Sequence, residues 1–341
     1  MSSIVKDRYD YIDAVKGVAI LCIVLMHFED GVFPVLFNVW TGLFMIAAFY
    51  FISGWIMGIK DIQMSPKQLF KKRLRQLGIP YVCFVLLILA FDLLLVLVGL
   101  MEVKIFFRDL YCAMTLRGIG ALWFLPVLLL GEWLFCIVRF SKHQCLLALV
   151  LFAVTLAVSY CYNDVWMKFR DLDDWHRIID SPMRPVVSGF KAWPIIGIGF
   201  LAGKYLGGRL PGLGTVRLMF AGVLLLAFSA WLVIKPAFHI YYLNDVLSRT
   251  IPALGFICIF MAVRGGILLK FLTYWGRNSL VLLGTHYSIT LVLFKLFDGK
   301  VLHHAEFSGG LTLVYFALAI LATCPVVALF NGKLTFMLGR S

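Results

Sequence analysis

The chain enters its first apolar segment through the stretch Y-I-D-A-V-K-G-V-A-I-L-C-I-V-L-M-H, from Tyr11 to His27. Its length is close to the roughly 20 residues that a helix needs to cross the hydrocarbon core of a bilayer. A secretory signal peptide is a poor interpretation, because the stretch has no small-residue cleavage site and carries Asp13, Lys16 and His27. The stretch therefore predicts a retained membrane helix.

The composition of the whole chain has the same character. Of 341 residues, 62% are hydrophobic and only 14% are charged, and the mean hydropathy is +0.94. Soluble domains carry roughly a quarter charged residues and about half apolar ones, so this composition excludes an ordinary soluble protein, a disordered chain and a disulfide scaffold. We expect an all-α polytopic membrane protein, with residues 1–341 forming a single integral membrane domain.

Charge asymmetry predicts the orientation. About ten spans can be placed by apolar length, at 13–33, 35–59, 79–101, 119–140, 144–162, 190–207, 216–236, 246–264, 278–297 and 310–331. With the N-terminus in the cytoplasm, 19 of the 31 Lys and Arg residues fall on the cytoplasmic side, as the positive-inside rule requires. We therefore expect both termini in the cytoplasm. The net charge of +13 then needs no nucleic acid as partner, and the lipid bilayer is the expected environment.

A polar stripe runs along the first helix. At 100° per residue, Asp13, Lys16 and His27 lie within about 60° of one another, and Lys16 and His27 are about 20° and roughly 16 Å apart. Ionisable groups inside a membrane are costly and therefore begin as functional candidates. A neutral imidazole there suits a general base near neutral pH. A histidine hydrogen-bonded between helices is the alternative, and the residues alone leave both open.

Other polar groups lie inside later spans. His286 follows Ser279 by seven residues, so the two share a helix face to within about 20°. For Glu132 and Asp92 we favour a side chain that snorkels toward the interface or one that is hydrogen-bonded between helices over a catalytic role. The group His303, His304 and Glu306 has only a faint resemblance to a metal site, and no metal is expected.

Two connections stand out. The segment S-P-K-Q-L-F-K-K-R-L-R-Q-L-G-I-P, Ser65 to Pro80, begins with an N-cap serine and a proline and ends at Gly78 and Pro80, which predicts a short interfacial helix. Five cations lie on this segment: Lys67, Lys71, Lys72, Arg73 and Arg75. They suit the binding of phosphate groups. Alternatively, they determine the orientation of the protein in the membrane and contact anionic lipid. The second connection, Cys161 to Lys191, is predicted to be a long external loop, and its aromatic residues suit a sugar or an interfacial belt.

Five motifs in order resemble the Acyltransferase 3 family of integral membrane acyltransferases. The first is Tyr11 to His27, in which Asp, a basic residue, Gly and a span-internal His recur in that order. The others are F-Y-F-I-S-G-W (Phe49 to Trp55), Arg73-Leu74-Arg75 followed by I-P-Y, A-L-W-F-L (Ala121 to Leu125) and G-R-N-S-L with His286. One departure is Lys16, where the family commonly has Arg, because Lys lacks the planar fork that pairs with a carboxylate in two places.

The resemblance implies a ten-helix bundle in the plasma membrane that moves an acyl group, usually acetyl, from cytoplasmic acyl-coenzyme A to a hydroxyl of a cell-surface glycan or lipid-linked sugar. It implies that His27 is the catalytic histidine, and we add Asp13 and His286 to the catalytic set. It also implies that Arg73 and Arg75 bind the phosphates of acetyl-CoA, and we add Lys16 and Lys72 to the donor-binding set. A transporter or flippase of a lipid-linked glycan is the alternative function.

Overall fold

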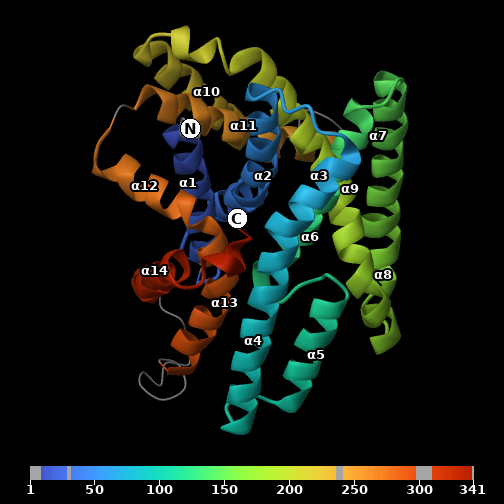
Figure 1. Cartoon of the computed structure of the whole chain (residues 1–341), viewed down its shortest axis with the longest axis vertical. Coiled ribbons are helices and arrows are strands. Elements are labelled where there is room, and N and C mark those ends of the chain that lie inside the picture. Colours follow the sequence, from blue (N-terminus) through green and yellow to red (C-terminus); the bar gives the residue numbers. More distant parts are fainter. Residues whose placement is uncertain (1–8, 29–31, 236–240, 264, 297–308, 340–341) are drawn as a thin grey trace, which may run out of the picture.

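The structure is a computed structural model that describes residues 9–28, 32–235, 241–263, 265–296 and 309–339. Every regular element in these ranges is a helix (Figure 1), which confirms the all-α prediction. The helices are α1 (Asp10–Met26), α2 (Val35–Ile59), α3 (Pro66–Arg73), η1 (Leu74–Gly78), α4 (Ile79–Leu97), α5 (Val103–Met114), η2 (Gly120–Trp123), α6 (Phe124–Arg139), α7 (Gln144–Tyr160), η3 (Cys161–Trp166), α8 (Met167–Phe169), α9 (Asp174–Leu206), η4 (Leu210–Gly212), α10 (Thr215–Ile234), α11 (Tyr241–Ala262), α12 (Ile267–Arg277), α13 (Ser279–Leu296), α14 (Gly309–Gly332) and η6 (Thr335–Leu338).

The helix lengths fit a polytopic membrane protein. Eight helical stretches of the described chain are long and apolar enough to cross a bilayer, at Val35–Ile59, Pro66–Leu97, Gly120–Arg139, Gln144–Phe169, Asp174–Leu206, Thr215–Ile234, Asp245–Ala262 and Leu311–Gly332. Helix α13 contains a shorter apolar stretch, Ser279–Phe294, and α1 is 17 residues long. The protein is therefore an all-α integral membrane protein.

The prediction of a long loop from Cys161 to Lys191 was wrong. Helices η3 and α8 continue from α7, and α9 begins at Asp174 and runs for 33 residues. The Asp173 carboxylate accepts a hydrogen bond from the His176 backbone N–H, 2.9 Å away, and this bond lowers the pKa of Asp173. A capped N-terminus therefore begins α9 sixteen residues earlier than the expected span.

The basic segment is also longer than predicted. The Ser65 side chain accepts from Gln68 and forms a capping box, and Pro66 occupies the first turn of α3, so the predicted start is confirmed. The helix does not end at Gly78 and Pro80, because a π-helical turn, η1, carries it directly into α4. A wider turn suits a proline in this position, since Pro80 has no N–H to donate back along the helix.

Small residues bring α2 and α9 into backbone contact. Gly54 and Gly58 are four residues apart on α2, and Gly199 and Gly203 are four apart on α9. A Cβ atom added at Gly54 would lie 1.9 Å from a carbonyl oxygen of α9. Such small-xxx-small pairs are how membrane helices gain packing contact without a hydrophobic driving force. This contact holds α2 against α9 near the C-terminal end of each helix.

The chain is irregular between α5 and α6. Helix α5 has only 12 residues and forms a hairpin with α4 at one end of the molecule (Figure 1). Positive φ angles follow at Leu116 (58°), Gly118 (71°) and Gly120 (56°). A Cβ at Gly118 would lie 2.3 Å from the Trp123 backbone N, so the turn requires glycine there. Irregular backbone inside a membrane bundle occurs where it is buried in protein or lines a cavity.

Candidate active site

Two histidines from distant parts of the chain meet inside the bundle. His27 directly follows α1 and His286 lies on α13; their rings are edge to face, with centroids 4.8 Å apart. His27 Nδ1 lies 2.7 Å from the Ile23 carbonyl oxygen, and His286 Nδ1 lies 2.8 Å from that of Leu282. A carbonyl only accepts, so each neutral ring carries its proton on Nδ1 and leaves the Nε2 lone pair available.

The two rings differ in access. His286 is fully buried, and its Nε2 has no hydrogen-bond partner within the described part of the chain. His27 is open to a cavity of about 400 Å³, which we call the histidine cavity. Its lining residues are Lys16, Ile20, Ile23, His27, Met45, Ile46, Phe49, Leu77, Gly120, Ala121, Trp123, Phe124, Leu125, Ser279, Leu280 and Leu283. Of the two histidines, only His27 can therefore meet a substrate directly.

Lys16 and His27 line the same cavity, as their spacing on one helix face predicts. The cavity therefore extends along α1 for about 16 Å at 1.5 Å per residue. Its volume lies in the range of roughly 300–1,000 Å³ that holds small-molecule ligands. Ser279 of α13 also lines the histidine cavity. The seven-residue spacing predicts that Ser279 lies on the same helix face as His286.

A network of charges lies at the Lys16 end. The buried Asp13 carboxylate is 3.4 Å from Lys16 Nζ and 3.3 Å from Arg277 Nε. Arg277 also reaches Asp10, at 2.7 Å. The backbones of α1 and α12 touch here, since a Cβ at Gly276 would lie 1.7 Å from the Asp13 carbonyl oxygen. Sequence reasoning missed Arg277 as a partner of Asp13, because only the packing of α12 against α1 brings the two side chains together.

The structure separates the two arginines that the sequence groups together. The Arg73 guanidinium is about a quarter exposed and pairs with Glu132, which is fully buried, through contacts of 2.6 and 2.8 Å. The Ser53 hydroxyl donates to the same carboxylate, so the prediction of interhelical bonding by Glu132 is confirmed. Arg75 and Lys72 lie exposed on the surface. None of these three cations lines the histidine cavity, which reaches η1 at Leu77.

Two candidates from the sequence remain, the Asp92 carboxylate and the faint resemblance to a metal site. Asp92 is fully buried on α4, and neither of its carboxylate oxygens has a hydrogen-bond partner among the described residues, so the predicted interhelical bond is not found there. No group of three or more His, Cys, Asp or Glu side chains in the described ranges is arranged to hold a metal ion. His303, His304 and Glu306 lie outside those ranges.

Comparison with known proteins identifies the family. Residues 9–332 match the family model of the acyltransferase domain Acyl_transf_3. The protein belongs to the Acyltransferase 3 family. It is therefore an integral membrane acyltransferase, as the five sequence motifs indicate, and family membership favours acyl transfer over the transport alternative. No curated protein and no solved structure matches the chain.

Proposed function

We propose that this acyltransferase moves an acyl group, most simply acetyl, from cytoplasmic acyl-coenzyme A to a hydroxyl of a cell-surface glycan or lipid-linked sugar at the plasma membrane. The observation that carries the proposal is the His27 ring, which is open to the histidine cavity and contacts a second, buried imidazole.

In the proposed reaction His27 Nε2 removes the proton of the acceptor hydroxyl. The hydroxyl oxygen then attacks the thioester carbonyl carbon, the C–S bond breaks, and the departing thiolate takes the proton back from His27. In a second route Nε2 attacks the thioester carbonyl carbon, the C–S bond breaks and the coenzyme leaves as the thiolate. The acceptor hydroxyl then attacks the acyl-imidazole, the N–C bond breaks and the proton of the hydroxyl goes to the thiolate. A trapped acyl-histidine or ping-pong kinetics identifies the second route, and ternary-complex kinetics identifies the first.

His286 acts as a positioning residue in this scheme. It contacts the His27 ring from the buried side, and backbone carbonyls fix the Nδ1 position of both rings. The oxyanion formed at the thioester needs a donor. The Ser53 hydroxyl already donates to Glu132, and the Asn278 amide already donates to the Tyr274 carbonyl. Trp123, which lines the cavity, is therefore the donor that we favour.

The donor is proposed to enter along the Lys16 end. Arg75 and Lys72 are exposed on the basic segment and suit the coenzyme phosphates, while Lys16 lines the cavity itself. A pantetheine arm of roughly 15–20 Å is comparable with the rise of about 16 Å from Lys16 to His27. Arg73, held by Glu132, contributes by fixing the helix that carries Arg75 and adds its exposed edge to the patch.

Transfer of label from acetyl-coenzyme A tests the proposal directly. Purified protein is given radiolabelled donor and a glycan extract, and label in the glycan fraction is counted. His27→Ala is expected to lower transfer by about 100-fold or more, the range of general base catalysis. His143→Ala, at an exposed loop histidine, is the matched control and retains full transfer. Substantial transfer by a correctly folded His27→Ala protein refutes the role of His27.

A further inference from the structure

A second cavity adjoins the first at the break between α5 and α6. It has a volume of about 590 Å³ and shares Gly120 and Trp123 with the histidine cavity. Tyr287, the residue after His286, forms part of its wall. The two cavities therefore meet beside the histidine pair, one from each side of the irregular segment. We call the second one the cationic cavity.

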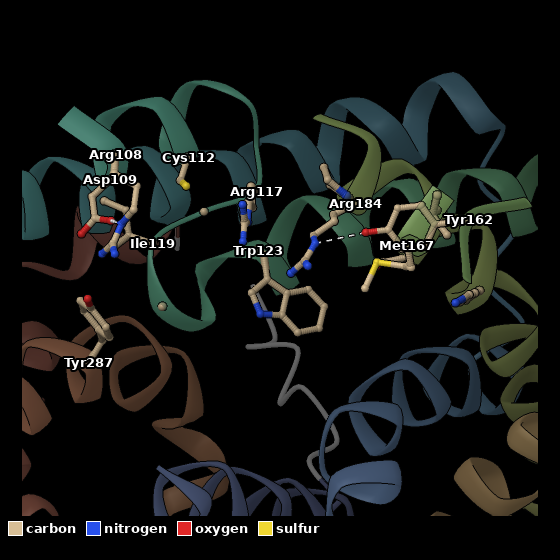
Figure 2. Close-up of a pocket in the computed structure, with 16 residues that line it drawn as sticks. Arg108, Asp109, Cys112, Arg117, Ile119, Trp123, Tyr162, Met167, Arg184 and Tyr287 are labelled. Carbon is tan, nitrogen blue, oxygen red and sulfur yellow. Dashed lines mark hydrogen bonds and ion pairs between the residues drawn. The ribbon is translucent and has the colours of Figure 1, made fainter. Parts of the chain in front are cut away.

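Four cations line this cavity: Arg108, Arg117, Arg184 and Lys191. Figure 2 shows Arg117 and Arg184 directed into the space beside Trp123, with Tyr162 to one side and Tyr287 to the other. The only carboxylate in the lining is Asp109. Among the residues that the structure describes, the wall thus carries more positive than negative side chains.

The four cations differ in their hydrogen-bond and ion-pair partners. Arg108 is 2.9 Å from Asp109, and Arg184 is 2.8 Å from the buried Asp180. Lys191 donates to a neutral amide oxygen, that of Asn163, at 3.2 Å. Half-buried Arg117 has neither a hydrogen bond nor an ion pair within the described residues. An arginine held in a cavity without a counter-charge is suited to bind an anionic oxygen group in two places.

The site is built on fixed backbone. Arg117 lies between Leu116 and Gly118, both at positive φ, so the turn that presents it is defined. On the other wall Asp180 accepts hydrogen bonds from Tyr162 at 2.8 Å and from Arg184. These bonds hold an aromatic ring and a guanidinium side by side, a combination that suits a sugar next to an anion.

From this arrangement we infer that the cationic cavity is the acceptor site and that the acceptor carries an anionic oxygen group, a phosphate or a carboxylate, close to the hydroxyl that is acylated. The assignment as acceptor site rests on the proposed function, but anion binding by Arg117 does not. The anion has two sources: the phosphate of a lipid-linked sugar, or an acidic sugar of a free glycan. The shared chemistry is recognition of the anionic oxygens by Arg117.

Binding measured without acyl donor tests the inference independently of catalysis. Two probe pairs are titrated calorimetrically into the purified full-length protein: geranyl phosphate against geraniol, and a glucuronic acid tetrasaccharide against maltotetraose. We expect the anionic member of one pair to bind at least about tenfold more tightly than its neutral partner, since charge-assisted hydrogen bonds contribute this much or more. The pair that shows the preference identifies the source of the anion.

Two variants locate the site. Arg117→Gln is expected to remove most of the preference, because it replaces the charged guanidinium with a shorter, uncharged polar side chain. Arg209→Gln, at an exposed cation that lines neither cavity, is expected to keep it. Equal binding of anionic and neutral probes, or a preference that survives Arg117→Gln, overturns the inference. Anion binding with no acyl transfer would instead count against the proposed function alone.

Discussion

Replacing Arg73 with glutamine separates a structural role from a donor-binding role. The Glu132 carboxylate has no exposed surface, and Arg73 Nε lies 2.6 Å from it. Arg73→Gln leaves the buried carboxylate without a cation. Removing one partner of a buried ion pair costs about 3–5 kcal/mol, and the lower end applies because Arg73 is 27% exposed.

A loss of about 3 kcal/mol raises the unfolding equilibrium constant roughly 150-fold. With an unfolding entropy of roughly 2.1 cal/mol/K per residue, the melting temperature of a chain of 341 residues falls by about 4 °C. The double variant Arg73→Gln/Glu132→Gln removes both charges, so we expect it to recover about 2 kcal/mol of that loss. Arg75→Gln, at an exposed position, is the matched control and changes stability by less than about 0.5 kcal/mol.

Purified protein in mixed micelles is unfolded by increasing dodecyl sulfate, which gives the free energy of unfolding, and separately by heating, which gives the melting temperature. Tryptophan fluorescence follows both transitions. The native protein, Arg73→Gln, Glu132→Gln and the double variant form a double-mutant cycle, and Arg75→Gln is measured beside it as the control. A melting curve for Arg73→Gln that overlays the native one refutes the structural role. If Arg73→Gln leaves the melting curve unchanged and raises the KM for acyl-coenzyme A as strongly as Arg75→Gln does, then Arg73 binds the acyl donor and does not act through its pairing with Glu132.

Three further predictions test donor binding, packing and the junction of the cavities. Arg75→Gln is expected to raise the KM for acyl-coenzyme A about tenfold; in steady-state kinetics, an effect on kcat alone contradicts phosphate binding. Gly54→Leu is expected to cost about 3 kcal/mol, because its Cβ would lie 1.9 Å from α9 backbone. Gly42→Leu, which meets nothing within 4 Å, is its control in the micelle assay. Gly120→Ala is expected to lower kcat about tenfold, because a Cβ there would crowd Tyr287 at 2.9 Å, and to cost about 1–3 kcal/mol of stability, because the backbone has a positive φ of 56°; unchanged kcat argues against a role for the junction.

The sequence predicts much of the fold because its strongest signals are local. An apolar run with inward polar residues predicts α1, and an N-cap serine before Pro66 predicts the start of α3. The missed part of α9 has a physical reason. Pro182 and Pro185 lie inside the missed part of that helix, and prolines inside a segment indicate a loop in soluble proteins. Within a membrane bundle, neighbouring helices and side chains satisfy the backbone groups that proline frees, so the helix continues.

Only part of the site can be predicted from residues that lie close together in the sequence. Helical spacing places Lys16 and His27 on one face, and both line the histidine cavity. Spacing along α1 says nothing about what faces His27, so the contact with His286 depends on how α13 packs. The same holds for Arg277, which reaches Asp13 across 264 positions of sequence. Buried charges indicate that partners exist, but only the packing of helices identifies them.

The break between α5 and α6 gives the proposed reaction its geometry. A donor that enters beside Lys16 and an acceptor that enters past Arg117 approach from different cavities, and an unbroken helix through residues 103–139 would place a continuous wall between them. The turn at Gly118 and Gly120 replaces that wall with Trp123, which lines both cavities. The acyl group then needs to move only between two groups held at the histidine pair. On this reasoning the irregular segment allows transfer within the membrane without moving either substrate across it.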